Sequence, residues 1–213
     1  GVRVDVGMGA EQSRELNLGF LSRFIRQAPW VRLKVAASLD GKTALPDGAS
    51  QWITSAQARQ DGHFWRARAC AILTGIGTVL ADNPRLDVRG VNSDRQPRLV
   101  VLDSQLRTPT DAAIFQAQRE VLIYTASSDM ERSQALQAAG ARVICMAGPD
   151  QRVDLRSMLT DLAKREVNEL HVEAGQDLNA ALLQASLVDE LLVYLAPCVL
   201  GQGKQMFPFG PLQ

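Results

Sequence analysis

The chain has 213 residues, of which 46% are hydrophobic and 22% charged, and its 23 basic and 23 acidic side chains balance. This composition is typical of a globular protein with one domain and an appendage, or with two small domains. The charge balance argues against binding to nucleic acid or an anionic membrane surface, and no apolar run approaches the ~20 residues that span a bilayer.

The first 28 residues stand apart from the rest of the chain. Residues 2–6 alternate apolar and polar side chains, which predicts a short strand. Residues 11–26 predict a helix, and its apolar stripe consists of Leu16, Phe20, Leu21, Phe24 and Ile25. A strand and a helix alone cannot bury both their faces, so we expect residues 1–28 to be the tail of a preceding domain or an arm on the main body.

The main domain begins with a predicted strand at residues 31–37, in which Lys34 lies near the carboxyl end. Such a lysine is either an edge-strand residue with a solvated head or a contact for an anionic substrate. A loop follows and ends at residues 50–52, and long ordered loops in compact domains tend to be functional.

A helix is predicted to follow this loop and to extend to Ala69. Thr54 is its expected N-cap, with Gln57 three residues later completing a capping box. Arg66 lies on this helix, and since most helix arginines are solvated, the pattern alone leaves open whether it contacts a ligand.

Residues 71–89 are the stretch most suggestive of a ligand site. A buried strand at 71–73 leads into a loop, Thr-Gly-Ile-Gly-Thr at 74–78, whose glycines would let a pyrophosphate approach the backbone. Leu80 stands where a dinucleotide fingerprint needs a third glycine, so the motif does not support a Rossmann domain. Arg85 and Arg89 follow as cationic forks for a second anion. An ordinary strand-ending turn is the alternative interpretation.

The remaining elements alternate between strand and helix. Strands are predicted at residues 98–102, 121–124, 142–145, 170–172 and 190–196. Helices are predicted at residues 129–139, 154–165 and 178–185. This alternation predicts an α/β fold with a mostly parallel sheet, right-handed crossovers and helices on both faces.

Ligands of such sheets bind at the carboxyl ends of the strands. Lys34, the 74–89 stretch, Ser104 and Glu173 are expected to converge there, beside the amino end of the last predicted helix, which is a second anion site. Asp103 and Ser104, with Arg107 nearby, suit the 2′-phosphate of NADP better than the bare ribose of NAD. Their alternative role is to cap a turn.

Cysteines and histidines give no sign of a metal centre. Cys70, Cys145 and Cys198 are far apart, and we expect all three to be reduced, mostly buried thiols in a cytoplasmic protein. The two histidines do not form a cluster with metal-ligand spacing, so no metal site is expected.

Six strings, in order along the chain, together resemble one known family. They are LKVAASLDGKTA (33–44), SQWITS (50–55), ILTGIGTVLADNPRLDVR (72–89), VVLDSQLR (100–107), VEAG (172–175) and YLAPCVLG (194–201). The combination resembles the reductase domain of the bifunctional riboflavin-biosynthesis deaminase/reductase. On this resemblance, residues 29–213 are a reductase domain and residues 1–28 the tail of the deaminase domain. The one H-x-E string, at residues 171–173, is not accompanied by a P-C-x-x-C, so the paired deaminase motifs are absent.

The family continues with a further strand where this chain ends, so the resemblance implies a C-terminally truncated domain. Because the deaminase domain itself is missing, the chain is expected not to deaminate. It also implies a dihydrofolate-reductase-like fold and a homodimer. The implied reaction is NADPH-dependent reduction of the ribosyl group of 5-amino-6-(5-phosphoribosylamino)uracil, which gives 5-amino-6-(5-phosphoribitylamino)uracil in riboflavin biosynthesis.

The resemblance also implies a set of site residues. Cofactor contacts on the nicotinamide side are Ala36, Trp52, Thr78 and Asp82. Ser104 contacts the adenosine side. The cofactor phosphates lie on Gly175, Gln176, Asp177, Leu178, Asn179, Ala180 and Ala181, mainly through main-chain groups. Substrate contacts are Ser50, Arg66, Leu86, Arg89 and Glu173, with Lys34 close by.

For the chemistry, hydride goes from NADPH to C1′ of the opened ribosylamine, and a proton must reach the nitrogen or the ring oxygen. We hypothesise that Asp82 and Glu173 orient the ribose hydroxyls and that Lys34 assists proton delivery. Arg66 and Arg89 would hold the 5-phosphate. The alternatives are another dihydrofolate or pterin reductase of the same fold and a non-catalytic NADP-binding fragment.

Overall fold

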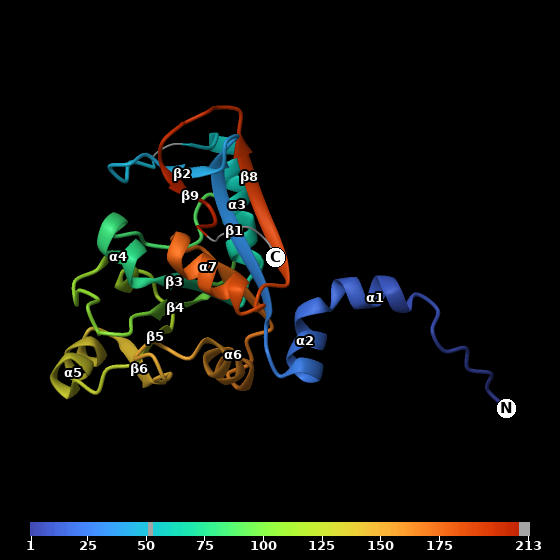
Figure 1. The fold of residues 1–213 in the computed structure, drawn as a ribbon. Helices are drawn as coiled ribbons and strands as arrows, with labels where there is room; N and C mark the ends of the chain where they lie inside the picture. Colours follow the sequence, from blue (N-terminus) through green and yellow to red (C-terminus); the bar gives the residue numbers. More distant parts are fainter. Residues whose placement is uncertain (51–52, 209–213) are drawn as a thin grey trace.

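Seven parallel strands form the central sheet of the computed structural model, which describes residues 1–50 and 53–208 (Figure 1). Their bounds are β1 Trp30–Ser38, β3 Ala71–Gly75, β4 Arg98–Leu102, β5 Val121–Thr125, β6 Ala141–Cys145, β7 Glu169–Val172 and β8 Glu190–Ala196. They lie in the order β6-β5-β4-β3-β7-β1-β8, and every neighbouring pair is parallel. The prediction of a parallel α/β sheet is confirmed, and each strand predicted for the main domain has bounds within two residues of the observed ones.

Helices connect the strands and cover both faces of the sheet. Their bounds are α3 Ala56–Arg68, α4 Ile76–Asp82, α5 Met130–Ala138, α6 Leu155–Lys164 and α7 Gln176–Gln184, with a short 3₁₀ turn at Ala113–Phe115. Asp129 and Asp154 cap α5 and α6 by accepting hydrogen bonds from first-turn N–H groups. The predicted cap of α3 is wrong by one residue, because Ser55 has the extended backbone of an N-cap and accepts from the Ala58 N–H.

Two hydrophobic clusters lie on opposite faces of the sheet. Side chains alternate along each strand, so Leu73 belongs to the cluster beneath α6 and α7, while its neighbour Ile72 belongs to the cluster beneath α4 and α5. The α3 helix lies on the Ile72 face but over β1 and β7, where the strands present polar side chains. There the guanidinium of Arg32, almost fully buried, stacks 4.3 Å from the ring centroid of Trp65. One end of the sheet is therefore packed with charges rather than hydrocarbon.

A two-stranded antiparallel ribbon sits above the carboxyl end of β1. It pairs β2 Lys42–Ala44 with β9 Lys204–Gln205, which the sequence did not predict. Gly203 is required there, because a Cβ at that position would lie 2.3 Å from the Ala44 carbonyl oxygen. Asp40 ties the same region together by accepting from the N–H groups of Leu200 and Gly201. The ribbon forms one rim of the site described below.

The amino-terminal segment differs from its prediction. Residues 2–6 are exposed and form no strand, because no described strand lies beside them to pair with (Figure 1). The predicted helix is split at Asn17 into α1 Ala10–Leu16, which buries no residue, and α2 Leu18–Arg26. The α2 helix packs on the body through Gly19 and through Arg26, whose guanidinium pairs with both oxygens of Asp189 at 2.5 and 2.8 Å.

Two further expectations concern exposure. The three cysteines are free, but Cys145 is exposed and Cys70 and Cys198 are only partly buried, so the expectation of mostly buried thiols is wrong. Cys145 ends β6, which is the edge strand of the described sheet and has a neighbouring strand on one side only.

Within residues 1–50 and 53–208, none of the helices combines the length and the apolar character that a membrane crossing requires.

Candidate functional site

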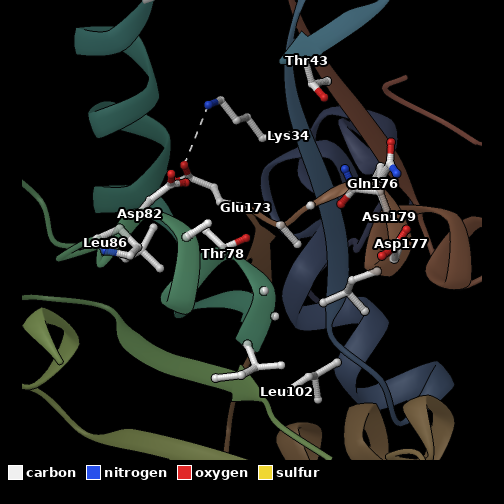
Figure 2. A pocket seen from close by; sticks show the side chains of 18 of the residues that line it. Lys34, Thr43, Thr78, Asp82, Leu86, Leu102, Glu173, Gln176, Asp177 and Asn179 are labelled. Carbon is white, nitrogen blue, oxygen red and sulfur yellow. Dashed lines mark ion pairs between the residues drawn. The ribbon is translucent and has the colours of Figure 1, made fainter. Parts of the chain in front are cut away.

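A pocket of about 1660 Å³ opens at the carboxyl ends of the strands, where the sequence predicted the ligand crevice. Its walls come from β1, α3, the start of α4, the 84–89 loop, the segment after β4 and the start of α7. Figure 2 shows Thr78 and Asp82 of α4 facing this space from one side, and Gln176, Asp177 and Asn179 of α7 from the other. A single small ligand fills roughly 300–1,000 Å³, so the pocket has room for two.

Two helix amino termini meet at the floor of the pocket. β3 and β7 are neighbouring strands, and each leads directly into a helix, α4 after Gly75 and α7 after Gly175. Neither glycine has a side chain to cap its helix, and a Cβ on Gly77 or Gly175 would meet nothing within 4 Å. First-turn N–H groups therefore remain available to an anion.

The local structure of the glycine stretch corrects one prediction. Thr74 and Gly75 are the last residues of β3, and Ile76 already begins α4, so the segment is not a free loop. Gly75 packs against α7, where a Cβ at its position would make an ordinary van der Waals contact with Leu178 at 3.5 Å. The groups that could bind an anion therefore belong to helix ends rather than to a loop.

Glu173 is the centre of an ion-pair cluster at the top of β7. Arg66 donates from Nε to Glu173 Oε1 and from Nη2 to Oε2 at 2.9 Å, and from Nη1 to the Asp87 carbonyl at 3.0 Å. Lys34 Nζ lies 3.8 Å from Oε2, as drawn in Figure 2. The guanidinium fork of Arg66 is thus directed at Glu173, and it holds the carboxylate bidentately.

The charge state of Glu173 follows from these neighbours. Burial favours its neutral form, but the charge and hydrogen bonds of Arg66, with nearby His171 and the Lys34 ammonium, hold the pKa of Glu173 well below its usual range. His171 itself is fully buried, and its Nε2 lies 3.6 Å from Glu173 Oε1, beyond hydrogen-bond distance. Glu173 is therefore an anionic hydrogen-bond acceptor at neutral pH rather than a proton donor.

The loop at residues 85–89 is held in place from beneath. The Asp87 side chain is buried and pairs with Arg85 Nη2 at 2.8 Å and with Arg89 Nη1 at 2.9 Å. Leu86 has a positive φ of 49°, and Arg119 donates to the carbonyls of Leu86 and Arg85. Sequence reasoning missed Asp87 and Arg119, since neither position carries a pattern beyond that of an ordinary charged residue.

Asp103 and Ser104, which follow β4 and were predicted together as contacts for a 2′-phosphate, have different roles in the structure. Asp103 is fully buried and its Oδ2 accepts from the N–H and hydroxyl of Thr108 at 2.7 Å, so it caps a turn. Ser104, by contrast, lines the pocket together with Arg107 and Arg152. The alternative interpretation is thus correct for Asp103, while Ser104 keeps its place at the site.

Nearly all the predicted site residues line this one pocket. They are Lys34, Ala36, Ser50, Arg66, Thr78, Asp82, Leu86, Arg89, Ser104, Glu173, Gly175, Gln176, Asp177, Leu178, Asn179 and Ala181. Ala180 is 7% exposed and does not line it. Trp52 lies outside the described residues. Across the described ranges, no group of three or more potential ligands is arranged to hold a metal ion.

Comparison with known proteins identifies relatives of the whole chain. The family model for the RibD C-terminal domain matches residues 29–213. The riboflavin biosynthesis protein RibD of Escherichia coli is 40% identical over 214 residues, which cover 94% of this chain and 57% of that protein. The RibD of Aquifex aeolicus is 33% identical and covers 99% of this chain. The chain thus spans less than three fifths of the length of these curated relatives.

Solved structures agree with this result. An Acinetobacter baumannii RibD structure superposes with a TM-score of 0.86 at 35% identity, over 100% of this chain and 58% of that one. A Thermotoga maritima structure, described as a diaminohydroxyphosphoribosylaminopyrimidine deaminase/5-amino-6-(5-phosphoribosylamino)uracil reductase, has a TM-score of 0.76 at 27% identity and covers 92% and 53%. The fold of the chain is therefore that of the carboxyl-terminal part of these proteins.

Proposed function

The chain belongs to the RibD C-terminal domain family, and from this premise we propose that it reduces 5-amino-6-(5-phosphoribosylamino)uracil to the ribitylamino product with NADPH. The observation that carries the proposal is the composition of the pocket. One cavity combines two open helix amino termini with a cluster of Lys34, Arg66, Glu173 and Arg89. The first feature suits a dinucleotide pyrophosphate and the second suits a sugar phosphate.

The floor of the pocket is the part that suits a nicotinamide cofactor. The space over Gly77 and Gly175 is open, and the first turns of α4 and α7 border it. We place the cofactor phosphates there, with the nicotinamide toward Ala36, Thr78 and Asp82. When bound, NADPH supplies the hydride that the ribosyl carbon receives.

The adenosine end distinguishes NADPH from NADH. Ser104 supplies a hydroxyl, and the nearby guanidinium of Arg107 is exposed and has no described ion-pair partner. A 2′-phosphate there would gain a charge-assisted hydrogen bond that a 2′-hydroxyl cannot make. This arrangement supports NADPH as the preferred coenzyme.

The substrate end relies on Arg89 and Glu173. Because Arg66 is largely engaged by Glu173 and Asp87, the more exposed Arg89 is the principal cation for the sugar phosphate. Anionic Glu173 accepts hydrogen bonds from the ribose hydroxyls, and Asp82 shares this task from α4. Lys34, 3.8 Å from Glu173, is placed to assist proton delivery.

The test is NADPH oxidation by the purified chain with the phosphoribosylaminouracil, followed by identification of the ribitylamino product. We expect turnover with NADPH and little with NADH.

Asp82→Asn and Glu173→Gln are then compared in single-turnover experiments with Asp94→Asn, a surface change, as the control. If both site variants kept near-normal hydride transfer, the proposed roles would be wrong. Turnover of dihydrofolate or a pterin instead, or of no substrate at all, would overturn the proposed function.

A further inference from the structure

His63 is a pocket residue to which neither the resemblance nor the proposed function assigns a role. It lies on α3 with Arg59, Gly62 and Arg66, and the spacing of three and four residues places all of them on one face of the helix. That face lines the cavity, and His63 is partly buried in it. The imidazole therefore borders the same space as the two predicted phosphate-binding arginines.

A single hydrogen bond determines which nitrogen of His63 carries a proton. The backbone N–H of Arg89 donates to His63 Nδ1 at 3.2 Å. An imidazole that accepts at Nδ1 carries its hydrogen on Nε2. Among the described residues no partner is present for Nε2, so an N–H donor remains available at the pocket wall.

The surrounding charges keep this imidazole neutral. Partial burial and the positive charges of Arg66 and Arg89 lower the pKa of His63, and the carboxylates of Glu173 and Asp87 only partly offset them. A neutral Nε2–H donor beside two guanidinium groups adds hydrogen-bonding capacity without further charge repulsion.

We propose that His63 is a further substrate-binding residue, which donates from Nε2–H to the phosphate of the sugar phosphate held by Arg89. The inference rests on the proposed function and deepens it. A phosphate has more acceptor sites than one guanidinium can satisfy, and three nitrogens of Arg66 already donate to Glu173 and Asp87. Through Nδ1, the same ring holds the backbone of Arg89 in place.

Two substitutions separate the functions of the two nitrogens. In His63→Gln the side-chain amide reaches the position of Nε2 and retains a donor there. In His63→Asn the shorter amide reaches only the position of Nδ1, so it accepts from the Arg89 N–H but offers no donor to the phosphate. If Nε2 binds phosphate, His63→Asn will lose affinity and His63→Gln will retain most of it.

The binding probe is ribose 5-phosphate, titrated calorimetrically into each protein without cofactor, with ribose as the uncharged control. We expect His63→Asn to weaken ribose 5-phosphate binding at least about tenfold, the usual effect of a lost hydrogen bond to a charged group. His63→Gln should stay within about threefold of the wild type. In turnover, His63→Asn should raise KM with little change in kcat, because the phosphate is remote from the reacting carbon.

Several outcomes would overturn the inference. These are normal ribose 5-phosphate binding by His63→Asn, an equal loss in His63→Gln, and no binding by the wild type. Thermal unfolding of both variants checks that they are folded. If the wild type bound ribose 5-phosphate with the expected variant pattern but did not oxidise NADPH, the proposed function would fail and the role of His63 would stand.

Discussion

Arg66 on α3 and Glu173 at the end of β7 form a bidentate ion pair whose side chains are only 15% and 12% exposed. The pair joins the helix to the strand across the pocket wall and fixes a carboxylate that lines the pocket. Because a buried charge is costly without its partner, this relationship gives both residues a structural role in addition to the functional one that we propose.

Removing one member of the pair should destabilise the fold. Arg66→Met leaves Glu173 with only Lys34, at 3.8 Å, and the buried His171 nearby, and we expect a loss of about 3 kcal/mol in the free energy of unfolding. The double variant Arg66→Met/Glu173→Leu should recover most of it. Arg68→Met is the control, because its pair with Glu169 is more exposed and is worth less than about 1 kcal/mol. Urea unfolding measures all three, and equal losses for Arg66→Met and Arg68→Met would contradict the prediction.

The same pair predicts a pH dependence of stability. The pKa of Glu173 is lowered in the folded state, while in the unfolded chain it is about 4.3. The ionised form therefore contributes stability above about pH 4.3, and this contribution is lost as the pH falls toward the folded-state value. The unfolding free energy of the wild type should drop more steeply below about pH 4.5 than that of Glu173→Gln. Parallel curves for the two proteins would show that Glu173 is not the group responsible.

Arg119 is predicted to act on the substrate through the 85–89 loop. Burial lowers the pKa of Arg119 to about 10, so it stays charged at neutral pH and binds the carbonyls of Arg85 and Leu86. Arg119→Met should raise KM for the phosphoribosyl substrate about tenfold, with little change in kcat or in KM for NADPH. Arg156→Met, which removes a donor on α6 to the Ala185 carbonyl at the end of α7, is the control. A change confined to kcat would contradict this positioning role.

Coenzyme preference should depend on Arg107. We expect Arg107→Ala to raise KM for NADPH about tenfold at low salt and to leave KM for NADH unchanged, because only NADPH carries a 2′-phosphate. Since Arg107 is exposed, the difference should shrink as the ionic strength rises. Arg142→Ala, on the exposed edge of β6, serves as the control. Equal effects on both coenzymes would place the 2′-phosphate elsewhere.

Much of the fold follows from short-range patterns. Strands such as β3 and β4 are continuous apolar runs, and α5 and α6 begin at aspartates that cap them, so their positions are encoded within a few residues. The strand predicted at residues 2–6 is absent from the structure because a strand also depends on long-range pairing. Alternation at residues 2–6 describes a segment that is able to pair, but pairing requires a neighbouring strand.

The candidate site likewise has a part that local sequence patterns predict and a part that depends on long-range packing. By itself the sequence determined the parallel sheet, the edge at which the pocket opens and the family, because apolar periodicity and contiguous motifs are local properties. Only the tertiary structure decided which charges meet. The α3 helix has no apolar face from which its orientation could be predicted, because it covers the part of the sheet that presents Arg32 and Glu173. The partnership of Arg66 with Glu173 and the hydrogen bond between His63 and Arg89 therefore depend on long-range packing that no local pattern specifies.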